Sequence, residues 1–257
     1  MKFNLKISKT SILEGMSEFF GTWVLVLALY LSSLILRGNE PLLVAIAYIV
    51  VIVTFGNFSR GHFNPLFTFS HLFTRLLESY KDKKVVIQEL KTAGMYLLVQ
   101  FLAVVAAYLV VARIQGAVVD YQIIKAGMEL TDATRSQVLS QVIYVNAYPV
   151  ASWKLAFFIE TVLSFVVALV YLINYFTTKT KTTIAMSVGL TFFVIEVFAN
   201  DISGSSFHFT KTIVAALFTG GDSWSFVGVY VAAGLIGALM AALVYVAFSK
   251  LQKTIKK

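Results

Sequence analysis

The stretch Gly61-His-Phe-Asn-Pro-Leu-Phe-Thr-Phe69 follows directly after an apolar run, residues 42–58, that is long enough for a membrane helix. Its Asn-Pro pair favours a turn where a spanning segment would leave the bilayer, and the chain then becomes apolar again. This second apolar stretch, Asn64 to Phe73, is only about ten residues long, enough for half a crossing. We therefore predict a half-helix that begins inside the membrane.

The composition is that of a polytopic membrane protein. Of the 257 residues, 58% are hydrophobic and only 13% are charged, whereas a soluble domain carries about 25% charged residues. The mean hydropathy is +0.81. Only helices and closed barrels satisfy the backbone in lipid, and the alternating pattern of a barrel is absent. The sequence predicts an all-α protein with six spanning helices, at residues 11–36, 42–58, 90–113, 154–176, 183–200 and 225–249.

The basic residues predict the topology. Most of the 21 Lys and Arg residues lie in the two termini and in alternate connections. The positive-inside rule then places both termini in the cytoplasm, with residues 114–153 forming an extracellular loop, and the plasma membrane is the expected location. The net charge of +8 thus reflects topology and contact with anionic lipids, not nucleic acid. Without cysteine, the chain has no disulfide and no thiolate metal site.

The two halves of the chain repeat each other. Glu18 and Glu160 occupy equivalent places in the first and fourth spans, and the segment at Ser59–Thr68 corresponds to that at Ser203–Thr212. Each half contains three spans and one apolar stretch of half a crossing, the second being Phe207 to Thr219. Because three is odd, the second half enters from the opposite face. We predict a single domain, residues 1–257, built from inverted repeats at about 11–113 and 154–249.

These motifs resemble those of the aquaporin, or major intrinsic protein, family. The residues that carry the resemblance are Ser17-Glu-Phe-Phe-Gly-Thr22, Gly61-His-Phe-Asn-Pro-Leu66, Gln100, Glu160 and Ser203-Gly204. The family has Asn-Pro-Ala twice, with an arginine after the second copy. Here the pore motifs read Asn64-Pro65-Leu66 and His208-Phe209-Thr210, and Lys211 takes the place of the arginine. The resemblance implies six spanning helices, two re-entrant half-helices and a homotetramer.

The facing half-helices have a physical purpose. Helix N-termini carry about half a positive charge, so two that meet in the membrane repel cations and protons from a pore between them. Asn64 is expected to cap its own half-helix and to offer an amide N–H to a passing water or hydroxyl. Pro65 costs nothing at the first helical position. A neutral His208 offers one N–H in the place of the second asparagine.

The two intramembrane carboxylates, Glu18 and Glu160, are expensive unless they are paired or hydrogen-bonded. By resemblance they support the two re-entrant loops from behind by accepting hydrogen bonds from loop amides. A proton relay and a place near the membrane interface are the alternatives.

The resemblance also assigns a selectivity filter. Counting from the two motifs, it falls on Val44, Glu196, Ser205 and Lys211. Val44 removes the family's aromatic residue, and a carboxylate and an ammonium would share one constriction, where they attract strongly at low dielectric. Glu196 and Lys211 would then form a polar gate or close the pore. Alternatively, the fifth span is shifted by a residue or two and Glu196 lies in a vestibule.

The predicted function is a passive channel for water and small uncharged solutes, without cofactor or metal. Enzymes are disfavoured because the three histidines lack metal-ligand spacing and no Gly-x-Ser-x-Gly occurs. A proton-coupled carrier could share the inverted repeat, but the short loops argue for a fixed pore. The main alternative is a non-conducting scaffold or a subunit of a larger membrane complex that kept the fold while its second motif diverged.

Overall fold

A computed structural model describes residues 8–35, 40–139, 152–178, 180–204, 207–220 and 224–255. Within these ranges the chain forms nine helices: α1 (Lys9–Ile35), α2 (Glu40–Phe55), α3 (Pro65–Ser79), α4 (Lys83–Lys125), α5 (Asp132–Leu139), α6 (Trp153–Thr177), α7 (Lys181–Ser203), α8 (Phe209–Thr219) and α9 (Trp224–Ile255). Five of them, α1, α4, α6, α7 and α9, are long and apolar enough to cross a membrane. The remaining predicted span, residues 42–58, corresponds to α2, a shorter apolar helix of 16 residues.

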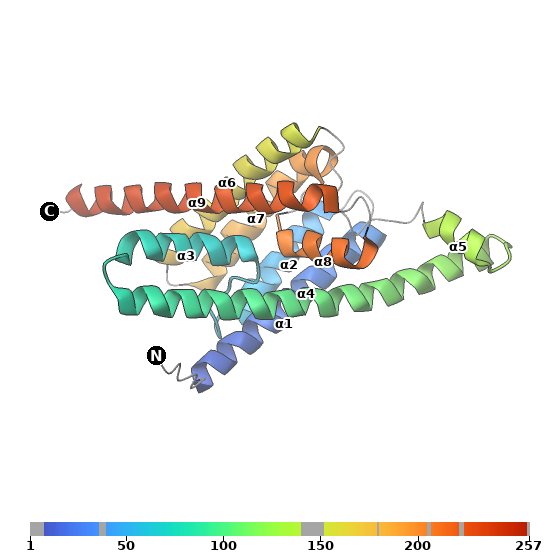
Figure 1. The fold of residues 1–257 in the computed structure, drawn as a ribbon, viewed down its shortest axis with the longest axis horizontal. Helices are drawn as coiled ribbons and strands as arrows, with labels where there is room; N and C mark the ends of the chain where they lie inside the picture. The colour runs from blue at the N-terminus through green and yellow to red at the C-terminus, as the bar shows by residue number, and fades with distance from the viewer. Residues whose placement is uncertain are drawn as a thin grey trace.

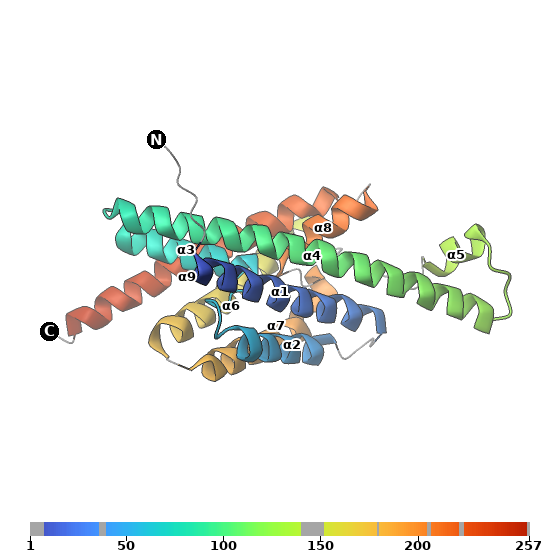
Figure 2. The same ribbon diagram turned by 90° about the horizontal axis from the view of Figure 1, so that it is seen from below.

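The two half-helices are the centre of the architecture. In Figure 1, α3 and α8 lie between the long helices α4 and α9, and they run from the middle of the bundle toward opposite ends. The start of α1 and the end of α9 lie at one end of the molecule, and α5 lies at the other (Figures 1 and 2). The prediction of an all-α bundle with two half-helices is thus confirmed within the described residues.

The helices around the half-helices pack in the order expected of two similar halves. In the first half α1 contacts α2 and α4, and in the second half α6 contacts α7 and α9. The halves meet where α2 packs against α7. Gly189 on α7 makes this approach possible, since a Cβ atom there would lie 2.8 Å from the backbone oxygen of Ala45. Small residues at such crossings let helix backbones come close.

One predicted boundary is wrong. Residues 114–125 were expected to open the polar connection 114–153, but they continue the third span as α4, which has 43 residues. At 1.5 Å per residue this helix is about 65 Å long, roughly twice the hydrocarbon thickness. It ends where Gly127, with a φ of 69°, donates to the carbonyl of Ile124 and Met128 donates to that of Ile123. This is the hydrogen-bond pattern of a Schellman cap.

Tertiary contacts explain why the helix continues so far. Val119 and Ile123 are buried on the projecting part of α4. Arg135 of α5 donates two hydrogen bonds to the carboxylate of Asp120, at 2.7 and 3.0 Å. The segment has no proline to stop a helix, and polarity alone did not reveal that α5 folds back onto it. Figure 2 shows this projection with α5 at its tip.

Candidate functional site

The chain turns sharply at Phe63, directly before α3. Phe63 has a φ of 51°, a conformation that costs a non-glycine residue about 1–3 kcal/mol. Two long-range hydrogen bonds hold it there. Its N–H donates to Glu18 Oε2 at 2.8 Å, and its carbonyl oxygen accepts from His208 Nε2 at 3.1 Å. The turn lets α3 begin in the interior of the bundle.

Asn64 is the fully buried cap of α3. Its Oδ1 accepts from the N–H of Leu66 at 2.9 Å, and Pro65 occupies the first helical position, where no N–H is needed. Its Nδ2 donates to the hydroxyl of Tyr48 at 2.7 Å and to the carbonyl of Phe207 at 3.0 Å. Both amide hydrogens are thus used within the protein. The sequence had predicted one of them free for a passing solute.

His208 occupies the equivalent place before α8. Its Nε2 lies 3.1 Å from the carbonyl oxygen of Phe63, so this nitrogen carries the hydrogen and donates it. Unlike Asn64, His208 makes no hydrogen bond from its side chain that caps the helix. The first turn of α8, which begins with Phe209 and Thr210, is closed by a backbone hydrogen bond from the N–H of Lys211 to the carbonyl of His208. Each motif therefore bonds to the carbonyl that precedes the other motif. We call the bonds Asn64–Phe207 and His208–Phe63 the reciprocal pair.

Glu18 lies behind the first loop and is fully buried. Its Oε1 accepts from the N–H of His62 at 3.0 Å and the hydroxyl of Ser59 at 2.7 Å, and its Oε2 accepts from the N–H of Phe63. Gln100 of α4 adds a bond from its Nε2 at 2.9 Å. Four donors therefore surround one carboxylate, which is how a buried charge is stabilised.

Glu160 has the corresponding place in the second half and is 1% exposed. It accepts a hydrogen bond from the hydroxyl of Ser203 at 2.6 Å. The carbonyl of Ser203 in turn accepts from the Tyr230 hydroxyl of α9. The predicted filter residue Ser205 lies outside the described residues.

The other predicted filter positions lie on three helices, α2, α7 and α8. Val44 of α2 and Glu196 of α7 are each 6% exposed. Lys211 lies in the first turn of α8, where Tyr30 donates to its carbonyl at 3.2 Å. Glu196 and Lys211 interact electrostatically, but they are not among the ion pairs within 4.0 Å that the described residues form. The electrostatic interaction shows that Glu196 and Lys211 lie in one region of the structure.

An aromatic cluster that no sequence motif indicated lies beside Asn64. The ring of Tyr48 stacks on that of Phe192 with centroids 3.8 Å apart and planes inclined by 7°. Phe67 stacks on Tyr171 with centroids 4.4 Å apart, and it lies 6.3 Å from both Tyr48 and Phe192. The signal was present in the register, since Tyr48 and Phe192 are each four residues from a predicted filter position on the same helix.

Ionic contacts anchor the first loop at the end of the bundle where α1 starts. Arg60 forms an ion pair with Glu89 of α4, and Arg75 of α3 lies 3.4 Å from the same carboxylate. Lys181, the first residue of α7, donates to the carbonyl of Arg60 at 3.1 Å. Within the described ranges, no three His, Cys, Asp or Glu side chains are grouped so that they could hold a metal ion.

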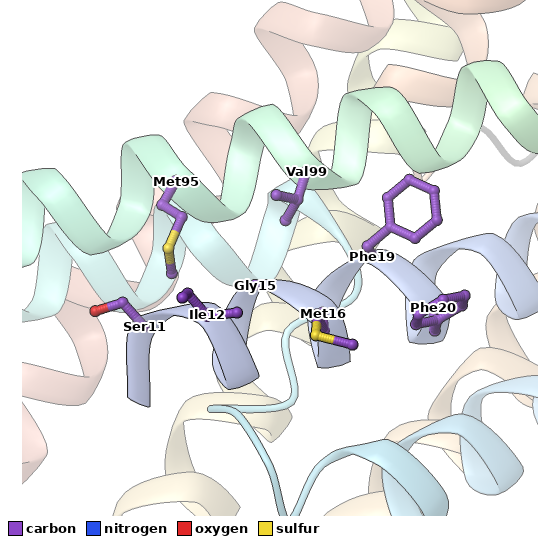
Figure 3. Close-up of a pocket in the computed structure, with 8 residues that line it drawn as sticks. All are labelled: Ser11, Ile12, Gly15, Met16, Phe19, Phe20, Met95 and Val99. Atoms are coloured by element: carbon purple, nitrogen blue, oxygen red, sulfur yellow. The ribbon is translucent and has the colours of Figure 1, made fainter. Parts of the chain in front are cut away.

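An apolar groove on the outside of the bundle is separate from this interior site. It lies between α1 and α4 (Figure 3). Its lining residues are Ser11, Ile12, Gly15, Met16, Phe19, Phe20, Met95 and Val99. Ile12, Met16 and Phe20 are each about half exposed, as expected of a surface that faces lipid.

Comparison with known proteins agrees with this geometry. A curated relative, "Glycerol uptake facilitator protein-like 6" of Lactiplantibacillus plantarum, is 25% identical over 232 residues, which cover 88% of this chain and 94% of the relative. The fold is similar to the X-ray structure of the aquaglyceroporin from Plasmodium falciparum, with a TM-score of 0.65 and 17% identity over 93% of this chain and 95% of the other.

The model of the family described as "Major intrinsic protein" matches residues 6–245, nearly the whole chain. Members of this family are multi-pass membrane channels and not enzymes. The match includes both half-helices, the reciprocal pair and the two buried carboxylates. The chain belongs to the major intrinsic protein family.

Proposed function

We propose that this protein is a passive channel for water and small uncharged solutes, with a path that runs past the joined N-termini of α3 and α8. The observation that carries the proposal is the reciprocal pair. Two half-helices that start in the interior, each tied to the carbonyl before the other, bring two positive helix ends together. Such a junction repels cations and protons, while a neutral molecule passes without a charge penalty.

The solute class that we favour is small polyols together with water. The two similar proteins named above are a glycerol uptake facilitator and an aquaglyceroporin. Val44 leaves more room at the predicted filter than an aromatic ring would. Glu196, Ser205 and Lys211 would supply the polar side of that filter, with hydrogen-bond partners for hydroxyl groups.

The remaining roles follow from the same scheme. Glu18 and Glu160 would fix the two loops, and Glu18 has the four donors that this role requires. The basic termini would face the cytoplasm, and residues 1–257 would act as one domain. Four copies would assemble in the membrane as a homotetramer surrounded by lipid.

Stopped-flow light scattering on reconstituted vesicles tests the channel. We expect water and glycerol permeability above that of protein-free vesicles, with no proton flux under an imposed pH gradient. Protein that is folded and inserted but adds no permeability to either solute would contradict the proposal.

A non-conducting scaffold is the second candidate, and one observation favours it. The aromatic side chains beside Asn64 are almost completely buried, and both N–H groups of that asparagine are bonded within the protein. The vesicle experiment separates the candidates, because a scaffold contributes no solute flux in any variant.

A further inference from the structure

The four aromatic side chains beside Asn64 come from four different elements. Tyr48 lies on α2, Phe67 on α3, Tyr171 on α6 and Phe192 on α7. The exposed fraction of each is 1% or less. Tyr48 stacks on Phe192, and Phe67 stacks on Tyr171. The ring of Phe67 also contacts both Tyr48 and Phe192, so the two stacks are adjacent. We call these four side chains the aromatic plug.

The helix register puts the plug on the predicted solute path. Residues four apart on a helix lie on the same face, one turn or about 5.4 Å along the axis. Tyr48 follows Val44 by four residues, and Phe192 precedes Glu196 by four. If Val44 and Glu196 face the pore, as proposed above, Tyr48 and Phe192 face the same pore one turn further inward.

The hydrogen bonding of Asn64 gives the same placement independently. The hydroxyl of Tyr48 accepts from Nδ2 of Asn64 at 2.7 Å. Under the proposed function this amide is the group that a passing water or polyol hydroxyl would use. The phenol oxygen of Tyr48 therefore occupies the position that a solute oxygen would take, and the ring of Tyr48 stacks on Phe192.

We propose that the aromatic plug is the tightest constriction of the pore and its gate, and that it limits flux more strongly than the predicted filter at Val44, Glu196 and Lys211. This inference rests on the proposed channel function. A solute passes when the rings of Tyr48 and Phe192 separate, and Tyr48 then releases Asn64 to the solute. The class of solute admitted is set by how far these rings open, so compact polyols pass more readily than longer ones.

The first test compares solute flux in Phe192→Ala with flux in the wild type. Removing the ring should raise glycerol permeability about tenfold or more, which corresponds to a barrier lowered by about 1.4 kcal/mol. It should also admit longer polyols such as xylitol. Phe193→Ala is the matched control, because Phe193 is the next residue on α7 and its side chain is 38% exposed on the outer surface. This control should leave flux unchanged.

The second test uses the absence of cysteine from the chain. Phe192→Cys should conduct more than the wild type, and a bulky methanethiosulfonate reagent should then block the added flux until a reducing agent restores it. Phe193→Cys treated in the same way should show no block. Because block and recovery are measured on one folded sample, a packing defect cannot imitate them.

The outcomes separate this inference from the function on which it rests. If the wild type conducts and neither Phe192→Ala nor Phe192→Cys changes its flux, the proposal of an aromatic plug is overturned, while the proposed channel function stands. No flux through the wild type, Phe192→Ala or a Phe67→Ala/Phe192→Ala double variant, all shown to be folded, would overturn the channel and the plug together. Increased flux with reversible block supports both.

Discussion

Asn64 and Phe207 lie 143 positions apart in the sequence, yet Nδ2 of Asn64 donates to the carbonyl of Phe207 at 3.0 Å. The reverse bond, from His208 to the carbonyl of Phe63, completes the reciprocal pair. The two half-helices are therefore joined at their N-termini by side chains that differ between the halves, an amide in one and an imidazole in the other. Both supply one N–H to the same kind of carbonyl, which is why the second motif can lose its asparagine and keep this contact.

Asn64→Asp should destabilise the protein. An aspartate keeps the capping oxygen for the N–H of Leu66 but loses both donors, so the carbonyl of Phe207 loses its bond and faces a carboxylate oxygen. An unsatisfied buried polar group costs about 1–3 kcal/mol, and a buried charge adds to this. Thermal unfolding in detergent measures the loss. Asn57→Asp, in the exposed loop before Ser59, is the control and should change little. Equal stability of the two variants would contradict the role of the reciprocal pair.

Glu18→Gln should loosen the loop before α3. In the wild type, the carboxylate of Glu18 accepts from several donors, among them the N–H groups of His62 and Phe63. A glutamine replaces one accepting oxygen with an NH₂ group, which cannot accept these hydrogen bonds. We expect a loss of about 1.5–3 kcal/mol, the usual contribution of hydrogen bonds to a charged group. Limited proteolysis and the unfolding temperature report it. Glu14→Gln, one turn earlier on α1, is the control, since Glu14 is less buried and accepts a long hydrogen bond, 3.4 Å, from Tyr96. A Glu18 variant as stable as the control would exclude the supporting role.

Glu89→Gln should weaken the attachment of the first loop to α4. Glu89 is largely buried and pairs with both Arg60 and Arg75, so its loss leaves two guanidinium groups without their shared partner. A double-mutant cycle with Arg60→Gln should give a coupling energy of about 0.5–3 kcal/mol. Glu78→Gln removes the more exposed partner of Arg75 and should cost less than about 1 kcal/mol. If the losses in unfolding free energy of the two single variants add up to that of the double variant, the Arg60–Glu89 pair contributes nothing to stability.

Neutralising the predicted filter should change flux less than opening the aromatic plug does. In Glu196→Gln/Lys211→Gln both charges are removed while the side-chain lengths are nearly kept. Under the proposal above, the aromatic plug and not this charged pair is the limiting barrier, so removing the two charges should change flux less. Glycerol flux through this double variant is compared with that through Phe192→Ala. A larger increase in the double variant would place the limiting barrier at the filter, and unchanged flux would remove the idea of a Glu196–Lys211 gate.

Much of the fold could be predicted because helix formation and membrane insertion depend on local sequence. Apolar length located the spans, and Asn64-Pro65 marked the start of α3 because a capping side chain and a residue without an N–H suit a helix N-terminus. The far end of α4 could not be predicted in this way. Residues 114–125 continue the helix where α5 contacts α4. Val119 and Ile123 are buried there, and Arg135 of α5 donates two hydrogen bonds to Asp120.

The sequence by itself determined the membrane-spanning helices, the two half-helices, the inverted repeat and the family, because these depend on hydrophobic length, on capping residues and on motif order. Only the tertiary structure decided which side chains meet between the halves. Tyr48 and Phe192 are 144 positions apart, and their stacking depends on how closely α2 approaches α7, a distance that no local pattern encodes. That packing places an aromatic plug beside Asn64, where the motif alone predicted an open amide.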